Sequence, residues 1–255
     1  MRQFDSWKSY WIFERAVKKQ NRYFRNDVIE KFLQTVLETS EKRKKKLPEK
    51  SYLWRAQLGH GWEPYYQDEE YIDDIPAPYP PERMSPLINE APEGRANPKG
   101  IPYLYTATTK ETAMAEVRPW LGSLISVGQF ETKKEMVLID CSIYHDRTVF
   151  YLQEPDPEKR EQAVWSHIDR AFSKPVTNND KIADYVPTQI IAELFKCNGY
   201  DGIVYKSMLG GGYNVVLFDI NSAKLVNCFL FEVERLSFSF KEAANPYFVR
   251  RKENN

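Results

Sequence analysis

The chain has 255 residues, of which 42% are hydrophobic and 14% aromatic, so it can bury a sizeable core. Basic and acidic residues number 36 each, which excludes a global charge that recruits nucleic acid or a membrane surface. No apolar run is long enough to span a bilayer, and the charged, amphipathic N-terminus lacks the apolar core of a signal peptide. We therefore expect a cytoplasmic protein.

Cysteines and histidines are few and scattered. Three cysteines, Cys141, Cys197 and Cys228, favour reduced thiols over disulfides. No two of the three histidines lie at metal-ligand spacing and no C-x-x-C is present, so we expect no metal site. The chain also lacks the G-x-S-x-G motif of serine hydrolases and the phosphate-binding loop motif.

Residues 1–49 read as a small helical extension. The apolar spacing of residues 28–37 predicts an amphipathic helix, and the aromatics of residues 7–13 indicate an earlier one. The basic run EKRKKK at 41–46 is typical of a solvated helix end. The next segment, 73–98, carries seven prolines, which exclude a helix or a central strand. It is either an ordered loop over a site or a mobile excursion.

After this segment helices and strands are interspersed. A strand signal also precedes it, at SYLWRAQ (51–57). Helices are expected at 108–119, 157–172 and 186–200. The remaining strands are expected at 101–108, 125–131, 135–143, 201–207, 214–220 and 224–233. We place the start of the first of these helices at a capping box formed by Thr108 and Glu111. Strands in mixed order with few helices predict an α+β fold with a strongly twisted or split mixed sheet.

Five polar residues stand near the ends of these elements: Arg55, Arg95, Glu116, Ser207 and Asn214. Each has an ordinary explanation when taken alone. An arginine commonly pairs with a nearby acid, a glutamate forms a surface ion pair, and a serine terminates a strand. Together they match a known pattern, which changes their weight.

That pattern resembles the RES domain family, over roughly residues 50–222. The resemblance rests on three stretches: WRAQ at 54–57, GRANPKGIPYLYTATTKETAMAE at 94–116, and YKSMLGGGYNVVLF at 205–218. The middle stretch is the specific one, with a Gly-Arg-x-Asn turn, a Leu-Tyr-Thr-Ala strand and then a glutamate in an Ala-rich helix. The organisation expected is a helical extension (1–49), a RES domain (50–240) and a C-terminal tail (241–255).

The resemblance implies an ADP-ribosyltransferase-like fold that acts on NAD+ as substrate. RES proteins are commonly toxins that deplete NAD+ by hydrolysis or phosphorolysis, some modify a protein instead, and many have an Xre-type antitoxin. The residues matched as catalytic are Glu116, Arg55 and Ser207. Those matched as NAD+-binding are Arg55, Arg95, Tyr105 and Asn214.

These side chains suit cleavage of the nicotinamide–ribose bond. The planar fork of an arginine matches phosphate oxygens, so Arg55 and Arg95 would clamp the pyrophosphate and the ribose. Glu116 would stabilise the cationic, oxocarbenium-like ribose of the transition state. Tyr105 offers a ring for stacking. Ser207 has no base to activate it, so we expect it to orient Arg55 or the ribose.

Several alternatives stay open at this level. Water, inorganic phosphate or a protein side chain could accept the ribose, and we favour consumption of NAD+ over protein ADP-ribosylation. Arg55 and His60 form an R-x4-H pattern like that of HEPN ribonucleases, but that motif belongs on a helix-bundle seam. A non-catalytic NAD+-binding module is the second rival. A homo-oligomer is allowed by the aromatic N-terminus, whereas membrane and nucleic-acid partners are not expected.

Overall fold

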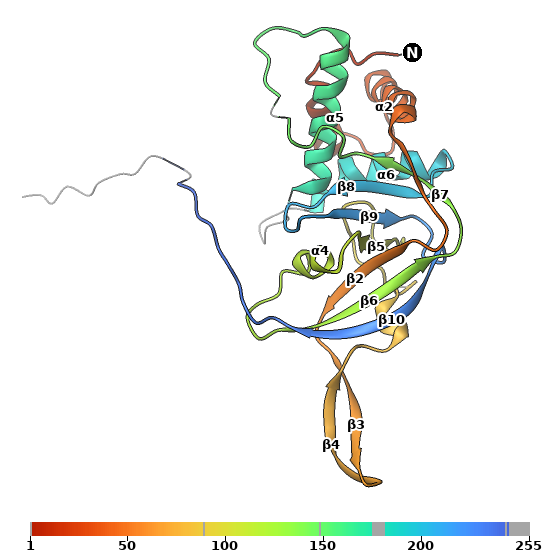
Figure 1. Ribbon diagram of the computed structural model, residues 1–255. Helices are drawn as coiled ribbons and strands as arrows, with labels where there is room; N and C mark the ends of the chain where they lie inside the picture. The colour runs from red at the N-terminus through yellow and green to blue at the C-terminus, as the bar shows by residue number, and fades with distance from the viewer. Residues whose placement is uncertain (1, 89, 148, 175–181, 243, 245–255) are drawn as a thin grey trace, which may run out of the picture.

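The computed structural model describes residues 2–88, 90–147, 149–174, 182–242 and 244. Within them, eight strands form one mixed sheet in the order β1-β7-β8-β9-β5-β2-β6-β10 (Figure 1). Only β7 and β8 pair in parallel. The strands are β1 Lys44–Leu47, β2 Tyr52–Leu58, β5 Leu104–Ala107, β6 Leu124–Thr132, β7 Met136–Asp140, β8 Gly202–Lys206, β9 Tyr213–Leu217 and β10 Ala223–Glu232.

The sheet is split between β5 and β2. These two strands share one register pair, Trp54 with Ala107, whereas β2 pairs with β6 along its whole length. One half-sheet is therefore β1-β7-β8-β9-β5 and the other is β2-β6-β10. Buried side chains from both halves, including Leu53, Phe130 and Val215, form one cluster. The predicted α+β fold with a split mixed sheet is confirmed.

Two helices, α5 Pro157–Ser173 and α6 Val186–Cys197, pack on one face of the first half-sheet. The helices α1 Ser9–Lys19 and α2 Asp27–Ser40 pack on these two in turn. The apolar stripes of these four helices meet in one large core, which contains Phe13, Leu33 and Trp165. Capping fixes where α2 and α5 begin, because the side chains of Asn26 and Asp156 each accept a hydrogen bond from a first-turn amide. Among the described helices, none is long and apolar enough to cross a membrane.

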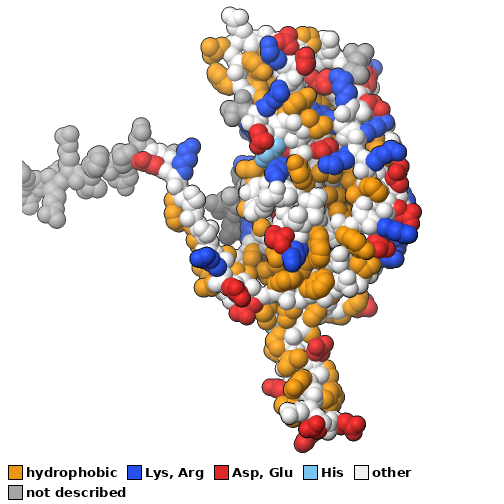
Figure 2. Space-filling view, in the orientation of Figure 1, with side chains coloured by type: hydrophobic (Ala, Val, Ile, Leu, Met, Phe, Trp, Pro, Cys, Tyr) orange, Lys and Arg blue, Asp and Glu red, His pale blue; other side chains and the backbone are white. Residues whose placement is uncertain are grey.

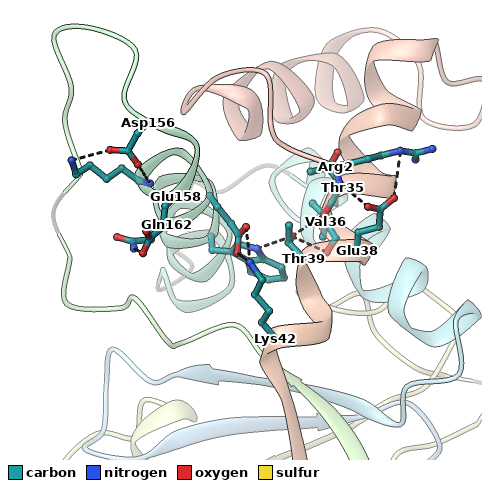
Figure 3. Close-up of polar contacts among 12 residues, drawn as sticks. Arg2, Thr35, Val36, Glu38, Thr39, Lys42, Asp156, Glu158 and Gln162 are labelled. Carbon is teal, nitrogen blue, oxygen red and sulfur yellow. Dashed lines mark hydrogen bonds and ion pairs between the residues drawn. The ribbon is translucent and has the colours of Figure 1, made fainter.

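The N-terminal segment is tied to α5 by polar contacts as well as by packing (Figure 3). The indole Nε1 of Trp165 donates to Thr39 Oγ1 at 3.0 Å, and Lys42 pairs with Glu161. The guanidinium of the buried Arg43 lies 4.0 Å from the Trp165 ring centroid. The boundary at residue 49 stays a prediction.

The expectation of a helix end over 41–46 is wrong for its second part. After a single 3-10 turn, Glu41–Arg43, the chain enters strand β1, Lys44–Leu47, which pairs antiparallel with β7. Arg43 turns inward onto the core and the three lysines stay exposed. Exposed lysines are typical of a strand at the edge of a sheet, where they discourage further pairing.

The proline-rich segment is more ordered than the sequence indicated. Residues 73–77 belong to β4, Glu70–Ala77, which pairs with β3, Gly61–Gln67, in a separate two-stranded hairpin. We call residues 61–77 the arm, because it projects away from the body (Figure 1). A short helix α3, Pro81–Met84, follows, so the exclusion of a helix was wrong there. Proline suits the first turn of a helix, where no amide partner is lost.

Candidate functional site

The short helix α4, Lys110–Glu116, carries the candidate carboxylate at its C-terminal end. Its N-cap is Thr109, whose side-chain oxygen accepts from the Thr112 amide at 3.2 Å. The predicted cap, Thr108, is wrong by one residue. Thr108 instead accepts from the Tyr213 amide at 3.0 Å, which ties α4 to the start of β9.

The loop from Ser207 to Gly212 packs tightly against this helix. The Gly212 amide donates to Thr112 Oγ1 at 2.9 Å, and the Gly212 carbonyl accepts from the Ser207 amide at 3.3 Å. A Cβ on Gly210 would lie 2.8 Å from Thr112 Cα, and one on Gly212 would lie 2.7 Å from the hydroxyl of Thr112. The glycines are therefore needed for close approach, which places Ser207 beside the end of α4.

Two side chains orient Glu116. Ser207 Oγ donates to Glu116 Oε1 at 2.6 Å, and Asn214 Nδ2 donates to the same oxygen at 2.8 Å. The Ser207 hydroxyl oxygen in turn accepts from the amides of Leu209 and Gly210. Within the described residues, Glu116 Oε2 accepts no hydrogen bond. The partner of the Ser207 side chain is thus Glu116, not Arg55.

Glu116 and Arg55 line one cavity of about 230 Å³, which we call the Glu116 cavity. It lies where the half-sheets meet, since β2, β5 and α4 all contribute to it. Its lining is Trp54, Arg55, Ala56, Tyr105, Thr106, Ala107, Ala113, Glu116, Val117, Tyr205 and Asn214. The fold therefore brings Arg55 and Glu116, two predicted site residues far apart in the chain, to the same cavity. Two more predicted site residues, Tyr105 and Asn214, also line it.

Arg55 is held in the middle of β2, rather than at its end, without a partner. Its Nε is buried and unbonded, and no hydrogen bond or ion pair reaches its guanidinium from the described part of the chain. Burial lowers the pKa of Arg55 to about 10. A charged group removed from water without a counter-charge is unfavourable. The buried guanidinium is therefore free to take an anion as its partner.

A second cavity, of about 280 Å³, adjoins the first and shares Arg55 and Tyr105 with it. We call it the Arg83 cavity, after the guanidinium that α3 contributes. Arg83 lies 5.2 Å over the Tyr79 ring and forms no ion pair with the described residues. The sequence interpretation missed Arg83. One feature of the sequence could have pointed to Arg83: no other lysine or arginine lies between Arg55 and Arg95.

The Gly-Arg-x-Asn turn packs against Tyr105. The Tyr105 hydroxyl donates to Asn97 Oδ1 at 2.7 Å and accepts from the Ala96 amide at 2.9 Å. A Cβ on Gly94 would lie 2.5 Å from that hydroxyl oxygen, so only glycine fits. Burial raises the pKa of Tyr105, which keeps the phenol protonated. The hydroxyl thus holds the turn, while the ring lines both cavities.

Arg95 lies apart from the two cavities. Its Nη1 donates to the Phe172 carbonyl at 2.5 Å, at the C-terminal end of α5, where a cation complements the helix dipole. It is not among the lining residues of either cavity. Its predicted contact with NAD+ stays a prediction.

The R-x4-H pattern lies outside any helix. Arg55 is in strand β2, and His60 lies between β2 and β3, where its Nδ1 is hydrogen-bonded to the Gly61 carbonyl. This placement contradicts the helix-bundle seam on which the ribonuclease interpretation depends. What the cavities offer instead is a free guanidinium and an oriented carboxylate, which can bind an anion and stabilise a developing cation.

Comparisons with known proteins were made for the whole chain. None of the curated proteins searched matches it. A solved structure, described as the crystal structure of the M. tuberculosis MbcT–MbcA toxin–antitoxin complex, aligns with a TM-score of 0.41 and 11% identity, covering 77% of this chain and 92% of that one. The RES domain model matches residues 53–240, which is most of the chain. By that match, the chain belongs to the RES domain family.

Proposed function

We propose that this protein is an NAD+-consuming enzyme that cleaves the bond between nicotinamide and ribose. Members of the RES family are generally NAD+-acting toxins, and we assign that activity to the Glu116 cavity and the Arg83 cavity. One observation carries it: an oriented Glu116 and an unpaired Arg55 line the same cavity. The substrate and family point to a toxin that acts in the cytoplasm.

Arg55 would bind the pyrophosphate. The Arg55 guanidinium is partly buried and has no counter-charge, so burial deprives it of hydrogen bonds to water. A phosphate oxygen would replace those hydrogen bonds. Arg83 would be the second guanidinium, because the two cavities adjoin at Arg55 and a dinucleotide is long enough to occupy both. Arg95 would contact NAD+ only after leaving the carbonyl at the end of α5.

Glu116 would stabilise the ribose as it becomes cationic. Ser207 and Asn214 hold Oε1, so Oε2 is the oxygen available to a ribose hydroxyl or to the attacking group. In NAD+ the nicotinamide is a cationic pyridinium, which takes the electron pair of the broken bond and leaves as a neutral molecule, so no second carboxylate is needed to protonate it. The ring of Tyr105 would stack on the substrate. Ser207 and Asn214 act through Glu116, as positioning residues.

The acceptor of the ribose is water or inorganic phosphate in this proposal. A protein side chain would make the enzyme an ADP-ribosyltransferase instead. An Xre-type antitoxin as partner is a further part of the proposal and follows from the family.

The test measures nicotinamide released from NAD+ by the purified full chain, with and without inorganic phosphate. We expect release by the wild type and a loss of about a thousandfold in Glu116→Gln, equivalent to ~4 kcal/mol of transition-state stabilisation. Glu111→Gln, an exposed glutamate on the same helix, is the matched control and should keep full activity. ADP-ribose as product indicates hydrolysis, and its 1″-phosphate indicates phosphorolysis.

Two outcomes contradict the proposal. The wild type would release no nicotinamide under either condition, or Glu116→Gln would retain the wild-type rate. Nicotinamide release that requires an added protein, which then carries ADP-ribose, would establish the transferase alternative.

A further inference from the structure

The arm, residues 61–77, exposes apolar side chains on an isolated hairpin that has little stability of its own. It is a two-stranded hairpin whose strands pair with no others in the described chain (Figure 1). Such a hairpin is marginally stable in water without further packing. Six large apolar side chains of the arm are exposed: Trp62, Tyr65, Tyr66, Tyr71, Ile72 and Ile75. By their register, Trp62 and Tyr65 lie on opposite faces of the hairpin, so exposed apolar groups occur on both faces. Exposed apolar groups at this density mark an interaction surface.

The arm is also strongly acidic. It carries six carboxylates and no lysine or arginine: Glu63, Asp68, Glu69, Glu70, Asp73 and Asp74. None of them forms an ion pair within the described residues. Figure 2 shows the arm as apolar surface interrupted by acidic groups, which gather at its tip. The tip is a tight turn in which Asp68 and Glu69 both adopt a positive φ, so it holds these carboxylates outward at the end of the hairpin.

The distribution of charge along the chain indicates which partner would complement the acidic arm. Six of the 36 acidic residues lie in the arm, so the other residues carry 36 basic groups against 30 acidic ones. Outside its arm, a second copy therefore carries a net positive charge, opposite in sign to that of the arm. Pairing of two arms with each other is disfavoured, because like charges would lie side by side.

We propose that the arm docks on the body of a second copy of this chain, and that two copies exchange arms to form a symmetric dimer. Reciprocal exchange closes the assembly at two copies, because each copy gives one arm and receives one. The apolar side chains would supply most of the affinity. The carboxylates would supply orientation and a dependence on salt.

Sedimentation velocity on the full chain tests this. At about 10 µM and low salt we expect a dimer, and raising NaCl from about 50 mM to about 500 mM should weaken it by roughly tenfold. The triple variant Trp62→Ser/Tyr66→Ser/Tyr71→Ser should weaken it by on the order of a hundredfold and sediment as a monomer. A matched control, Tyr23→Ser/Phe24→Ser, removes two exposed aromatics of the body at 89% and 88% exposure and should leave the dimer intact.

The arm variants are expected to stay folded, because Ala77 is the arm's one buried residue in the described chain. Thermal unfolding of each variant checks this directly. A wild type that is monomeric at about 100 µM overturns the proposal. It does so even if the arm then binds an unrelated basic protein. A triple variant that dimerises like the wild type overturns the proposal as well. Neutralising the tip with Asp68→Asn/Glu69→Gln/Glu70→Gln should weaken the dimer, and a stronger dimer would contradict the charge argument.

Discussion

Replacing Arg55 with methionine should stabilise the protein and abolish substrate binding at the same time. Burial lowers the pKa of Arg55 to about 10, which corresponds to roughly 3 kcal/mol against the charged form in the folded chain. Part of the side chain is exposed, so we discount this to about 1–2 kcal/mol. Methionine keeps the unbranched stem and removes the unpaired charge. For a chain of this length, we expect the Tm to rise by about 2–4 °C.

Thermal unfolding with and without NAD+ measures both effects. The ligand effect is measured in the Glu116→Gln background, which consumes NAD+ about a thousandfold more slowly. Glu116→Gln should gain about 2.7 kcal/mol at a hundredfold excess of NAD+ over its Kd, and Glu116→Gln/Arg55→Met should gain nothing. The control is Arg43→Met. That guanidinium stacks on Trp165 and donates to the Asp140 carbonyl, so its loss should destabilise by about 1–3 kcal/mol. If Arg55→Met were destabilised by a similar amount, Arg55 would have a structural partner and the anion-binding argument would be refuted.

Three further predictions follow from contacts in the site and the core. Ser207→Ala and Asn214→Ala should each lower kcat by about tenfold with little change in KM, because each removes one hydrogen-bond donor to Glu116 Oε1. An equal change in kcat and KM would contradict a positioning role. Gly212→Ala should shift the loop that carries Ser207 and lower kcat by at least about tenfold, and wild-type kinetics would show that the loop yields freely. Burial, with a smaller contribution from Arg170, lowers the pKa of His167 to about 4, so the unfolded chain binds the extra proton as pH falls from 6.5 to about 4. Stability should therefore fall by up to about 3 kcal/mol across that window, and urea unfolding of His167→Leu should show a flatter pH profile than the wild type.

Local sequence signals predicted the body of the fold well. The β-strands after residue 100 and the helices α2, α5 and α6 lie close to their expected ranges, since apolar periodicity and caps act within one element. The start of α4 was missed by one residue because two adjacent threonines, Thr108 and Thr109, can each serve as the cap. Which threonine caps the helix was decided by the contact between Thr108 and Tyr213, more than 100 residues apart.

The arm was missed because its sequence is typical of a loop. Pro64 and Pro76 are rare in strands, and six acidic residues interrupt the apolar pattern. A two-stranded hairpin with both edges open tolerates proline, since each strand needs partners on one side only. The prolines therefore excluded a central strand correctly and said nothing about a free hairpin.

The candidate site was partly readable from residue type. Glu116 and Arg55 were chosen because they match the RES pattern and because their chemistry suits NAD+. Their meeting in one cavity depends on how the half-sheets cross, which no local pattern reports. Arg95 and Arg83 show the limit of that approach. Both are arginines of the proline-rich segment 73–98, and only their surroundings distinguish them: Arg95 lies at a helix end and Arg83 lines a cavity.

The single ladder pair between Trp54 and Ala107 means that the two half-sheets are joined at their seam mainly by side-chain packing rather than by backbone hydrogen bonds. Arg55 stands on one side of the seam, in β2, and Glu116 stands on the other, on the helix that follows β5. A bound dinucleotide would act as a brace across the two halves, so occupancy should slow amide hydrogen exchange along β2 and β5 together.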